Sequence, residues 1–281
     1  MTLTEFSKQK TYLVCVDSDG CAMDTMDVKH FRCFGPCMAD EWRLDAWREE
    51  ILTRWNEINL YTVTRGINRF KGLAIALGEI HARYTPIDGI DDLVDWAEHS
   101  PELSNAALGR MIEQHPDKQV FAKALAWSMA VNKSITALPD ALKQPFPLAR
   151  EALAHAHTFA DVAVVSGANL DAVLAEWQEH GLLDHVDVVC SQNDGSKAYC
   201  IQKLLEKGYD STCVLMCGDA PGDLVAAEKN SVFFYPILVK AERESWREFI
   251  DVASGKLQSG TYGGDYAQQK RRAFYSNLGE N

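Results

Sequence analysis

The chain has 281 residues, of which 47% are hydrophobic and 24% charged, and its formal net charge is −12 at pH 7. This length can bury a substantial core in one large or two medium domains. The acidic balance argues against non-specific nucleic-acid binding, and no apolar run approaches the roughly 18 residues of a membrane span, so neither kind of partner is expected.

The first residues, MTLTEFSKQK, lack the apolar core of an export signal, which predicts a cytoplasmic protein. In that compartment the eight cysteines are expected to be reduced, and most lie in apolar runs where they would pack as small hydrophobes. Cys33 and Cys37 have a CxxxC spacing that could suggest zinc. Only His30 lies near them, and four ligands are normally required, so a structural metal is not favoured.

The first predicted element is a buried strand over Tyr12–Val16, an apolar run with β-branched residues. Two carboxylates, Asp17 and Asp19, follow it and precede Gly20. Open α/β sheets present their chemistry at the carboxyl ends of their strands. Two acids there can bind a hard cation and leave one carboxylate free to react. Taken alone, the segment also fits a strand that ends in an Asp-Gly turn.

From about residue 40 to residue 133 apolar residues recur near helical spacing. Five helices are predicted there, separated by prolines or short polar turns: 40–60, 66–84, 88–99, 102–115 and 117–133. An all-helical domain over residues 26–147 would thus be inserted directly behind the first strand. Insertions at a catalytic strand end commonly gate or select, so this one is expected to act as a cap.

From residue 148 strands and helices alternate. The strands are predicted at 161–166, 185–191, 211–219 and 231–239, and the helices at 169–180, 196–207, 221–229 and 242–253. This order predicts an α/β fold with a doubly wound, Rossmann-like parallel sheet, made of residues 1–25 and 148–257. The polar segment 258–281 is expected to be a surface tail.

Further reactive groups follow the later strands. Ser166 ends one strand, and Gly167 and Asn169 come after it, the latter as a helix cap. Lys197 begins the helix behind the next strand. Since parallel strands bring their carboxyl ends to one edge, these groups should lie beside Asp17.

The following strand supplies a second acid pair, Asp219 and Asp223, in the segment CGDAPGD. Phosphoryl transfer needs this combination of acids, hydroxyl and lysine. A carboxylate can attack phosphorus and become an aspartyl-phosphate, a Mg²⁺ held by few protein oxygens neutralises charge, and lysine and hydroxyl donors hold the phosphoryl oxygens.

These segments resemble the four motifs of the haloacid dehalogenase-like (HAD) superfamily, in its phosphatase branch. The first motif, Asp-x-Asp-Gly-Thr-x-x-Asp-Ser/Thr, is matched by residues 17–25, and the fourth, Gly-Asp-x-x-x-Asp, by residues 218–223. The serine or threonine motif falls on Ser166 and the lysine motif on Lys197. All four occur in the family's order, and the helical insertion looks like a C1 cap, as in phosphoglycolate phosphatase-like members.

The resemblance implies a role for each matched residue. Asp17 would attack the phosphorus, and Asp19 would protonate the leaving oxygen and then activate water. Ser166 and Lys197 would bind the phosphoryl group, and Lys197 would also restrain Asp17. Mg²⁺ would be held by the carboxylate of Asp17, the backbone carbonyl of Asp19, Asp219 and, through water or as an outer partner, Asp223.

Two features depart from this pattern or compete with it. Cys21 replaces the threonine that usually follows Asp-Gly, which places either an oxidation-sensitive thiol or an inert buried one near the site. Lys203 could take the place of Lys197, but it lies further into its helix and fits a solvated face.

Substrate contacts are expected from Gly20, Gly167 and Asn169 in the core and from Arg65 and Arg69 in the insertion. The two arginines belong to a local group of cations that could meet a second anionic group of the substrate. Solvated helix faces would explain them equally well.

The sequence therefore predicts a Mg²⁺-dependent phosphomonoester hydrolase that acts on a small phosphorylated metabolite, as a monomer or homodimer. Asp19 argues against a C–halogen hydrolase, which has no leaving alcohol to protonate. A phosphonate hydrolase would need a cap lysine, such as Lys29 or Lys71, to form a Schiff base. A phosphomutase of the same fold would need a bisphosphate intermediate and a cap that retains the product. A non-catalytic binding module would have no need of the intact Asp17, Asp19, Lys197 and Asp219.

Overall fold

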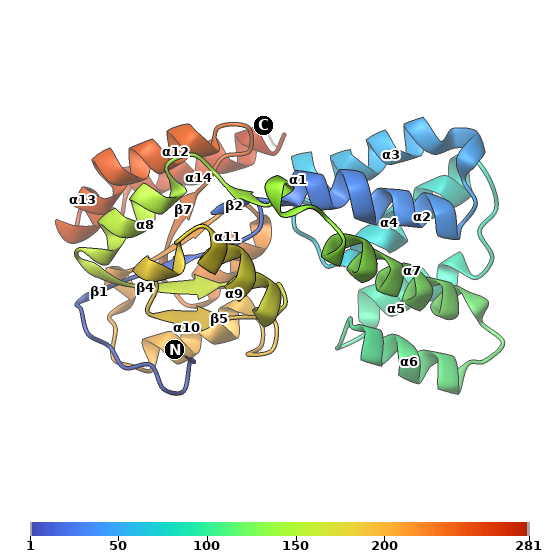
Figure 1. Cartoon of the computed structure of the whole chain (residues 1–281), viewed down its shortest axis with the longest axis horizontal. Helices are drawn as coiled ribbons and strands as arrows, with labels where there is room; N and C mark the ends of the chain where they lie inside the picture. The colour runs from blue at the N-terminus through green and yellow to red at the C-terminus, as the bar shows by residue number, and fades with distance from the viewer. Residues whose placement is uncertain (1, 280–281) are drawn as a thin grey trace. The chain divides into compact units, whose positions relative to one another are not determined.

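The structure, a computed structural model, describes residues 2–279, and these form two compact units. The sheet unit comprises the chain up to Met26 and from Asp140 onward, and the helical unit spans Asp27–Pro139. Figure 1 shows both, with the strands confined to the first.

The helical unit ends earlier than the expected insertion of residues 26–147, because residues 140–147 belong to the sheet unit. Within them β3 (Gln144–Pro145) pairs antiparallel with β2 (Met23–Asp24), the short strand behind the first acid pair. Phe146 N also donates to Ala22 O at 2.9 Å. Two strands too short to give a periodic signal thus tie both connecting segments together.

The main sheet has five parallel strands in the order β5-β4-β1-β6-β7. Their bounds are β1 Tyr12–Val16, β4 Ala160–Val165, β5 Val188–Cys190, β6 Val214–Gly218 and β7 Phe233–Pro236. β1 lies in the centre, where Val16 pairs with Val164 on one side and Cys217 on the other. This register brings the carboxyl ends of β4, β1 and β6 level with one another and confirms the predicted doubly wound α/β fold.

One helix precedes β4, and helices follow each strand of the sheet after β1. They are α8 Ala149–His157, α9 Leu170–Glu179, α10 Lys197–Leu205, α11 Pro221–Lys229, α12 Glu242–Glu248, α13 Ser254–Gln258 and α14 Asp265–Asn277, with a π-helical segment over Phe249–Ala253. The sequence predicts α9 to α12 but not α8. The buried face of α8 is mostly alanine, at Ala149, Ala152 and Ala156, which weakens the periodic signal.

The sequence predicts a surface tail over residues 258–281, and the structure describes this segment as far as residue 279. The described part is packed against the sheet unit rather than extended over its surface. Tyr262 and Phe274 are buried, and Tyr262 Oη donates to Phe234 O at 2.7 Å. The ring of Phe274 meets that of Phe234 edge-on, with centroids 5.1 Å apart. The aromatic residues of this segment therefore anchor α14 against the edge strand β7.

The helical unit contains α2 Gly35–Glu41, α3 Arg48–Asn56, α4 Arg69–Arg83, α5 Ile90–His99, α6 Asn105–Gln114 and α7 Gln119–Thr136, preceded by α1 Met26–Lys29. The single helix predicted over 40–60 is divided, because the chain turns at Arg43, where φ is +55°. Two π-helical segments, His30–Phe34 and Glu57–Tyr61, extend α1 and α3.

Tryptophans dominate the core of the helical unit. Trp55 and Trp127 are buried, with ring centroids 6.0 Å apart, and Trp96 packs against Phe70 with ring centroids 5.4 Å apart.

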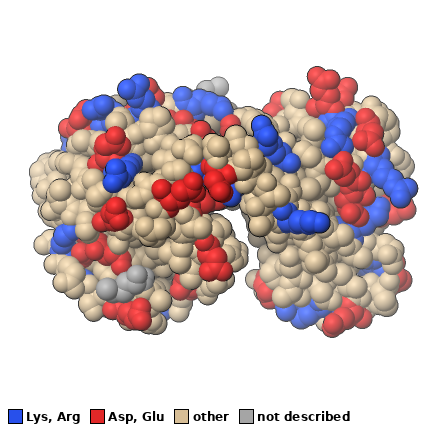
Figure 2. Space-filling model, in the orientation of Figure 1, with Lys and Arg blue, Asp and Glu red and all other residues tan. Residues whose placement is uncertain are grey.

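Among residues 2–279 no helix has the length and apolarity that crossing a membrane requires. On the face shown in Figure 2, basic side chains are interspersed with acidic ones rather than gathered into one surface.

Candidate active site

The segment after β1 is a compact turn built from its own backbone. Asp17 N donates to Cys217 O at 3.0 Å and so extends the sheet by one residue. The carbonyl of Ser18 then accepts from the amides of Cys21, Ala22 and Met23, at 3.3, 3.0 and 2.9 Å. Gly20 has φ of +82°, the left-handed region that glycine adopts without steric cost. This turn directly follows the strand and carries both acids of the first motif.

Lys197 joins the first acid to the last. Its Nζ lies 2.7 Å from Asp17 Oδ2 and 2.6 Å from Asp223 Oδ1. Ser196 caps α10 by accepting from Tyr199 N at 3.2 Å, and this cap places Lys197 at the first helical position. Lys197 therefore pairs with Asp17, the residue that it is predicted to restrain, and also with Asp223.

Three buried acids converge at the carboxyl edge of the sheet. Carboxylate oxygens of Asp17, Asp219 and Asp223 lie within 4.8 Å of one another, the only such group of potential metal ligands among the described residues. A methyl group at Gly218 would lie 2.4 Å from the side chain of Asp223. Only glycine therefore allows the end of β6 to pass so close to the first turn of α11.

The charges of these groups are strongly coupled. Burial raises the pKa of Asp17 well above its ordinary value, and the neighbouring Asp223 and Asp219 add to this while Lys197 opposes it. Burial alone would lower the pKa of Lys197, but its ion pairs with Asp17 and Asp223 outweigh that effect and raise it. Three carboxylates and one ammonium carry a formal charge of −2.

A divalent cation fits this cluster, because hard cations prefer several carboxylate oxygens and would balance that charge. Asp17 and Asp219 directly follow strand ends, and Asp223 lies on the first turn of α11, where its Oδ2 also accepts from Ala220 N at 3.1 Å. The carboxylates of Asp17, Asp219 and Asp223, all predicted to hold Mg²⁺, are therefore close enough to share one ion.

Asp19 contacts a residue of its own motif. The hydroxyl of the buried Thr25 donates to Asp19 Oδ1. Thr25 occupies the last position of the first motif, and that position is the only sequence signal for this contact.

Cys21 is buried, with Sγ 3.6 Å from Cys217 O. Burial and the nearby acids raise the pKa of its thiol well above the ordinary value. These surroundings favour the inert buried thiol over the oxidation-sensitive one, because the thiolate is the reactive form.

The segment after β4 also carries its predicted groups. Ser166 is buried, its N donates to Cys190 O at 2.9 Å, and its Oγ accepts from Ala168 N at 3.1 Å. Gly167 leaves space where a side chain would begin, with no atom within 4 Å. The side chain of Asn169 accepts from Asp171 N at 2.9 Å, as the predicted cap of α9.

The predicted substrate-binding arginines make contacts inside the helical unit. Arg65 is buried and its Nη1 donates to Leu60 O at 2.7 Å. Arg69 donates to Asn132 Oδ1 at 2.7 Å and lies over the ring of Phe34, 5.1 Å from its centroid. These contacts argue against the alternative that both arginines lie on solvated helix faces. That the two arginines contact the substrate stays a prediction.

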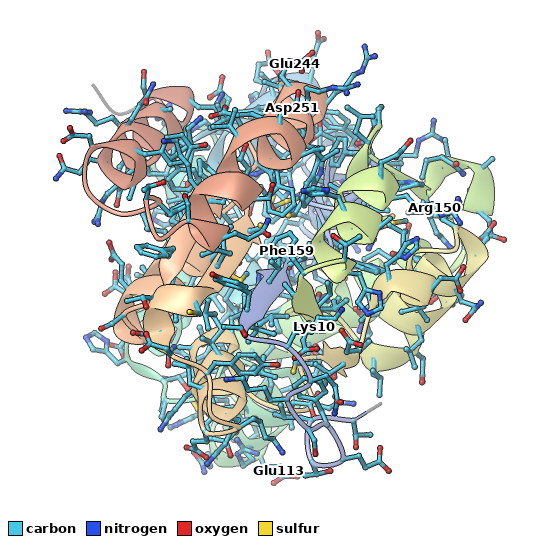
Figure 3. All side chains as sticks on the ribbon, turned by 90° about the vertical axis from the view of Figure 1, so that its left-hand side faces the viewer. Lys10, Glu113, Arg150, Phe159, Glu244 and Asp251 are labelled. Carbon is cyan, nitrogen blue, oxygen red and sulfur yellow. The ribbon has the colours of Figure 1, made fainter. Side chains whose placement is uncertain are left out.

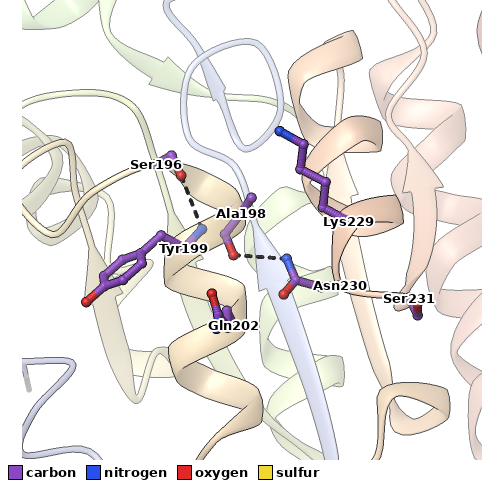
Figure 4. Close-up of a pocket in the computed structure, with 7 residues that line it drawn as sticks. All are labelled: Ser196, Ala198, Tyr199, Gln202, Lys229, Asn230 and Ser231. Carbon is purple, nitrogen blue, oxygen red and sulfur yellow. Dashed lines mark hydrogen bonds between the residues drawn. The ribbon is translucent and has the colours of Figure 1, made fainter. Parts of the chain in front are cut away.

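Two other features of the sheet unit lie outside the acid cluster. Lys203 pairs with Glu206 on the exposed side of α10, at 2.8 Å, as expected for a solvated face. The pocket in Figure 4 lies between α10 and the end of α11, next to Tyr199, Gln202 and Lys229, and none of the predicted site residues lines it.

No protein-family model and no curated protein matches this chain, but solved structures do. One from Thermotoga maritima, provisionally described as a β-phosphoglucomutase, has a TM-score of 0.51 and 14% identity over 87% of this chain and 99% of that one. One from Lactobacillus delbrueckii subsp. bulgaricus, provisionally described as a phosphoglycolate phosphatase, has a TM-score of 0.50 and 15% identity over 97% and 100%.

A third, from Bacteroides fragilis and provisionally described as a haloacid dehalogenase-like hydrolase, has a TM-score of 0.51 and 14% identity over 84% of this chain and 93% of that one. At identities this low, the structural similarity establishes a shared fold only, and the activity follows from the residues of the site. The chain has the fold of the haloacid dehalogenase-like hydrolases, as the order of its four motifs predicted.

Proposed function

We propose that the protein is a phosphomonoester hydrolase that depends on Mg²⁺ and works through a phosphoryl group carried on Asp17. The observation that supports this most strongly is the junction at Lys197, whose ammonium lies within 2.7 Å of Asp17 and 2.6 Å of Asp223. Lysine, nucleophilic carboxylate and metal-binding acids are thereby held in one buried cluster. A fold that only bound a partner would have no need to bury these charges together.

The reaction divides between the two acids of the first motif. The carboxylate of Asp17 attacks phosphorus, and the bond from phosphorus to the leaving oxygen breaks as Asp19 gives that oxygen a proton. Asp19 then removes a proton from a water that attacks phosphorus, which releases inorganic phosphate and restores Asp17. Ser166 and Lys197 donate hydrogen bonds to the phosphoryl oxygens.

Asp17, Asp219 and Asp223, with the carbonyl of Asp19, would hold the Mg²⁺. When bound, the ion neutralises the charge of the acids and of the phosphoryl group, which lets one anion approach another. The substrate is proposed to be a small phosphorylated metabolite, handled in the cytoplasm by a monomer or homodimer.

A panel of phosphate esters and phosphonates, assayed for phosphate release with Mg²⁺ and with EDTA, tests this proposal. We expect turnover of at least one ester, none of it in EDTA, and loss of activity in Lys197→Met. Lys203→Met removes a lysine from the same helix outside the cluster and should retain activity. Failure to hydrolyse any ester would favour the non-catalytic module, and turnover of phosphonates alone would favour Schiff-base chemistry.

A further inference from the structure

The turn that carries Asp17 and Asp19 has side-chain support from outside the motif. Ser18, between the two acids, is buried, and its carbonyl is the acceptor on which three amides of the turn converge. Any rotation of the peptides around Ser18 would therefore move both acids together. What fixes Ser18 also fixes the geometry of the proposed reaction.

Two buried indoles hold this turn. Trp177, on α9, donates from Nε1 to Ser18 Oγ at 2.8 Å. Trp246, on α12, donates from Nε1 to Cys21 O at 3.1 Å. Both tryptophans are at most 1% exposed, so neither indole N–H could exchange its hydrogen bond to the turn for one to bulk water. Both belong to the hydrophobic cluster that also contains Val14 and Val16 of β1, the strand that leads into the turn.

The chemistry of these contacts separates positioning from simple packing. A phenylalanine would fill most of the same apolar space, but it has no N–H. The serine hydroxyl is likewise unusual at a buried position unless a partner satisfies it. Trp177 and Ser18 satisfy each other across 159 residues of sequence, and the hydrogen bond defines one orientation of the turn.

We propose that Trp177 and Trp246 are positioning residues that hold the Asp17–Asp19 turn in its reactive orientation through their two indole hydrogen bonds. The proposal rests on the phosphatase function above. Displacements of about 1 Å far from the chemistry can cost up to about a hundredfold in rate, so two hydrogen bonds on one short turn can influence kcat.

The test is a double-mutant cycle on Trp177→Phe and Ser18→Ala, with Trp246→Phe measured alone. Either single variant should lower kcat by about tenfold to a hundredfold while KM changes less than about twofold, because the contact orients the acids rather than the substrate. Urea unfolding should show that the double variant recovers stability, since no buried donor or acceptor is left without a partner. Its kcat should stay as low as that of either single variant.

Tyr262→Phe is the matched control. Like Trp246→Phe, it removes one buried side-chain hydrogen bond to a backbone carbonyl of the sheet unit, here Phe234 O, but that carbonyl is outside the turn. It should lower stability without changing kcat. An unchanged kcat in Trp177→Phe, or a double variant that recovers kcat together with stability, would show that the indole only packs the core.

Hydrogen–deuterium exchange gives a readout that needs no activity. The amides of Cys21, Ala22 and Met23 should exchange faster in Trp177→Phe and Trp246→Phe than in the wild type, and at the wild-type rate in Tyr262→Phe. If the wild type hydrolyses no ester, the proposed function fails while this measurement still tests the two indoles. Unchanged exchange in both tryptophan variants would overturn the positioning role.

Discussion

Two buried aspartates lie at opposite edges of the same sheet and have opposite surroundings. Asp17, at the carboxyl end of β1, is 6% exposed and lies among two other acids and one lysine. Asp161, near the amino end of β4, is 0% exposed, and its Oδ2 accepts from Gln9 N and Lys10 N, each at 2.9 Å, and from the hydroxyl of Tyr209.

Figure 3 labels Lys10, whose amide donates to Asp161, and Phe159, which directly precedes β4. The Asp161 carboxylate ties the segment before β1 to β4 through three donors on its Oδ2, while its buried Oδ1 has no hydrogen-bond partner in the part of the chain that the structure describes. Asp17 is instead placed where burial and like charges disfavour ionisation. Burial alone therefore does not distinguish a functional acid from a structural one. The distinction lies in the neighbours, which are hydrogen-bond donors around Asp161 and mainly other carboxylates around Asp17.

The largest expected effect is on the functional side of this comparison. Asp17→Asn should lower kcat by at least about 10⁴-fold, because the amide cannot act as the nucleophile. Without Mg²⁺ its free energy of unfolding should not fall by more than about 1 kcal/mol, since Lys197 keeps Asp223 as a partner and a crowded charge is removed. Steady-state kinetics and urea unfolding measure the two quantities, and retained turnover would refute the assignment of the nucleophile.

The acid cluster can also be disturbed through the backbone. Gly218→Ala should weaken Mg²⁺ binding at least about tenfold and cost about 1–3 kcal/mol of stability, because the new methyl group would overlap the side chain of Asp223. Gly222→Ala is the matched control, since no atom lies within 4 Å of its added methyl group. Isothermal titration with Mg²⁺ compares the two, and equal affinities would contradict the required close approach.

The structural acid should show the reverse pattern. Asp161→Ala leaves the amides of Gln9 and Lys10 and the Tyr209 hydroxyl without their acceptor, at a cost of about 1–3 kcal/mol or more. We expect kcat of the folded enzyme to remain within about twofold of the wild type, because the cluster at the other edge keeps its contacts. A large loss of kcat with little loss of stability would abolish the distinction between the two edges.

The smallest effect is a pH dependence at this structural edge. Burial and the hydrogen bond to Asp161 raise the pKa of Tyr209 above its ordinary value. Above about pH 10 the folded protein therefore keeps the phenol proton that the unfolded chain has lost. The contribution of Tyr209 to the free energy of unfolding is complete below about pH 10 and declines as the pH rises further. Urea unfolding between about pH 9 and 11 should show a slope shallower in Tyr209→Phe by at most about 1.4 kcal/mol per pH unit, and equal slopes would contradict the raised pKa.

The strand ends were predictable because parallel strands are apolar runs and the reactive groups stand directly behind them. Asp17, Ser166 and Asp219 each follow a buried strand, and Lys197 opens a helix with a serine cap. These are local patterns that need no knowledge of distant contacts. The short strands, the alanine-rich α8 and the anchored α14 were missed, because their structure depends on the surfaces that they cover.

By itself, then, the sequence determined the order of the elements and the residues at the strand ends, since both follow from periodicity and chain order. Only the tertiary structure decided how the acids differ from one another. It paired Lys197 with both Asp17 and Asp223, required glycine at position 218, and brought Trp177 to Ser18. These contacts depend on distances between residues far apart in the chain, and only the packing of the helices on the sheet sets those distances.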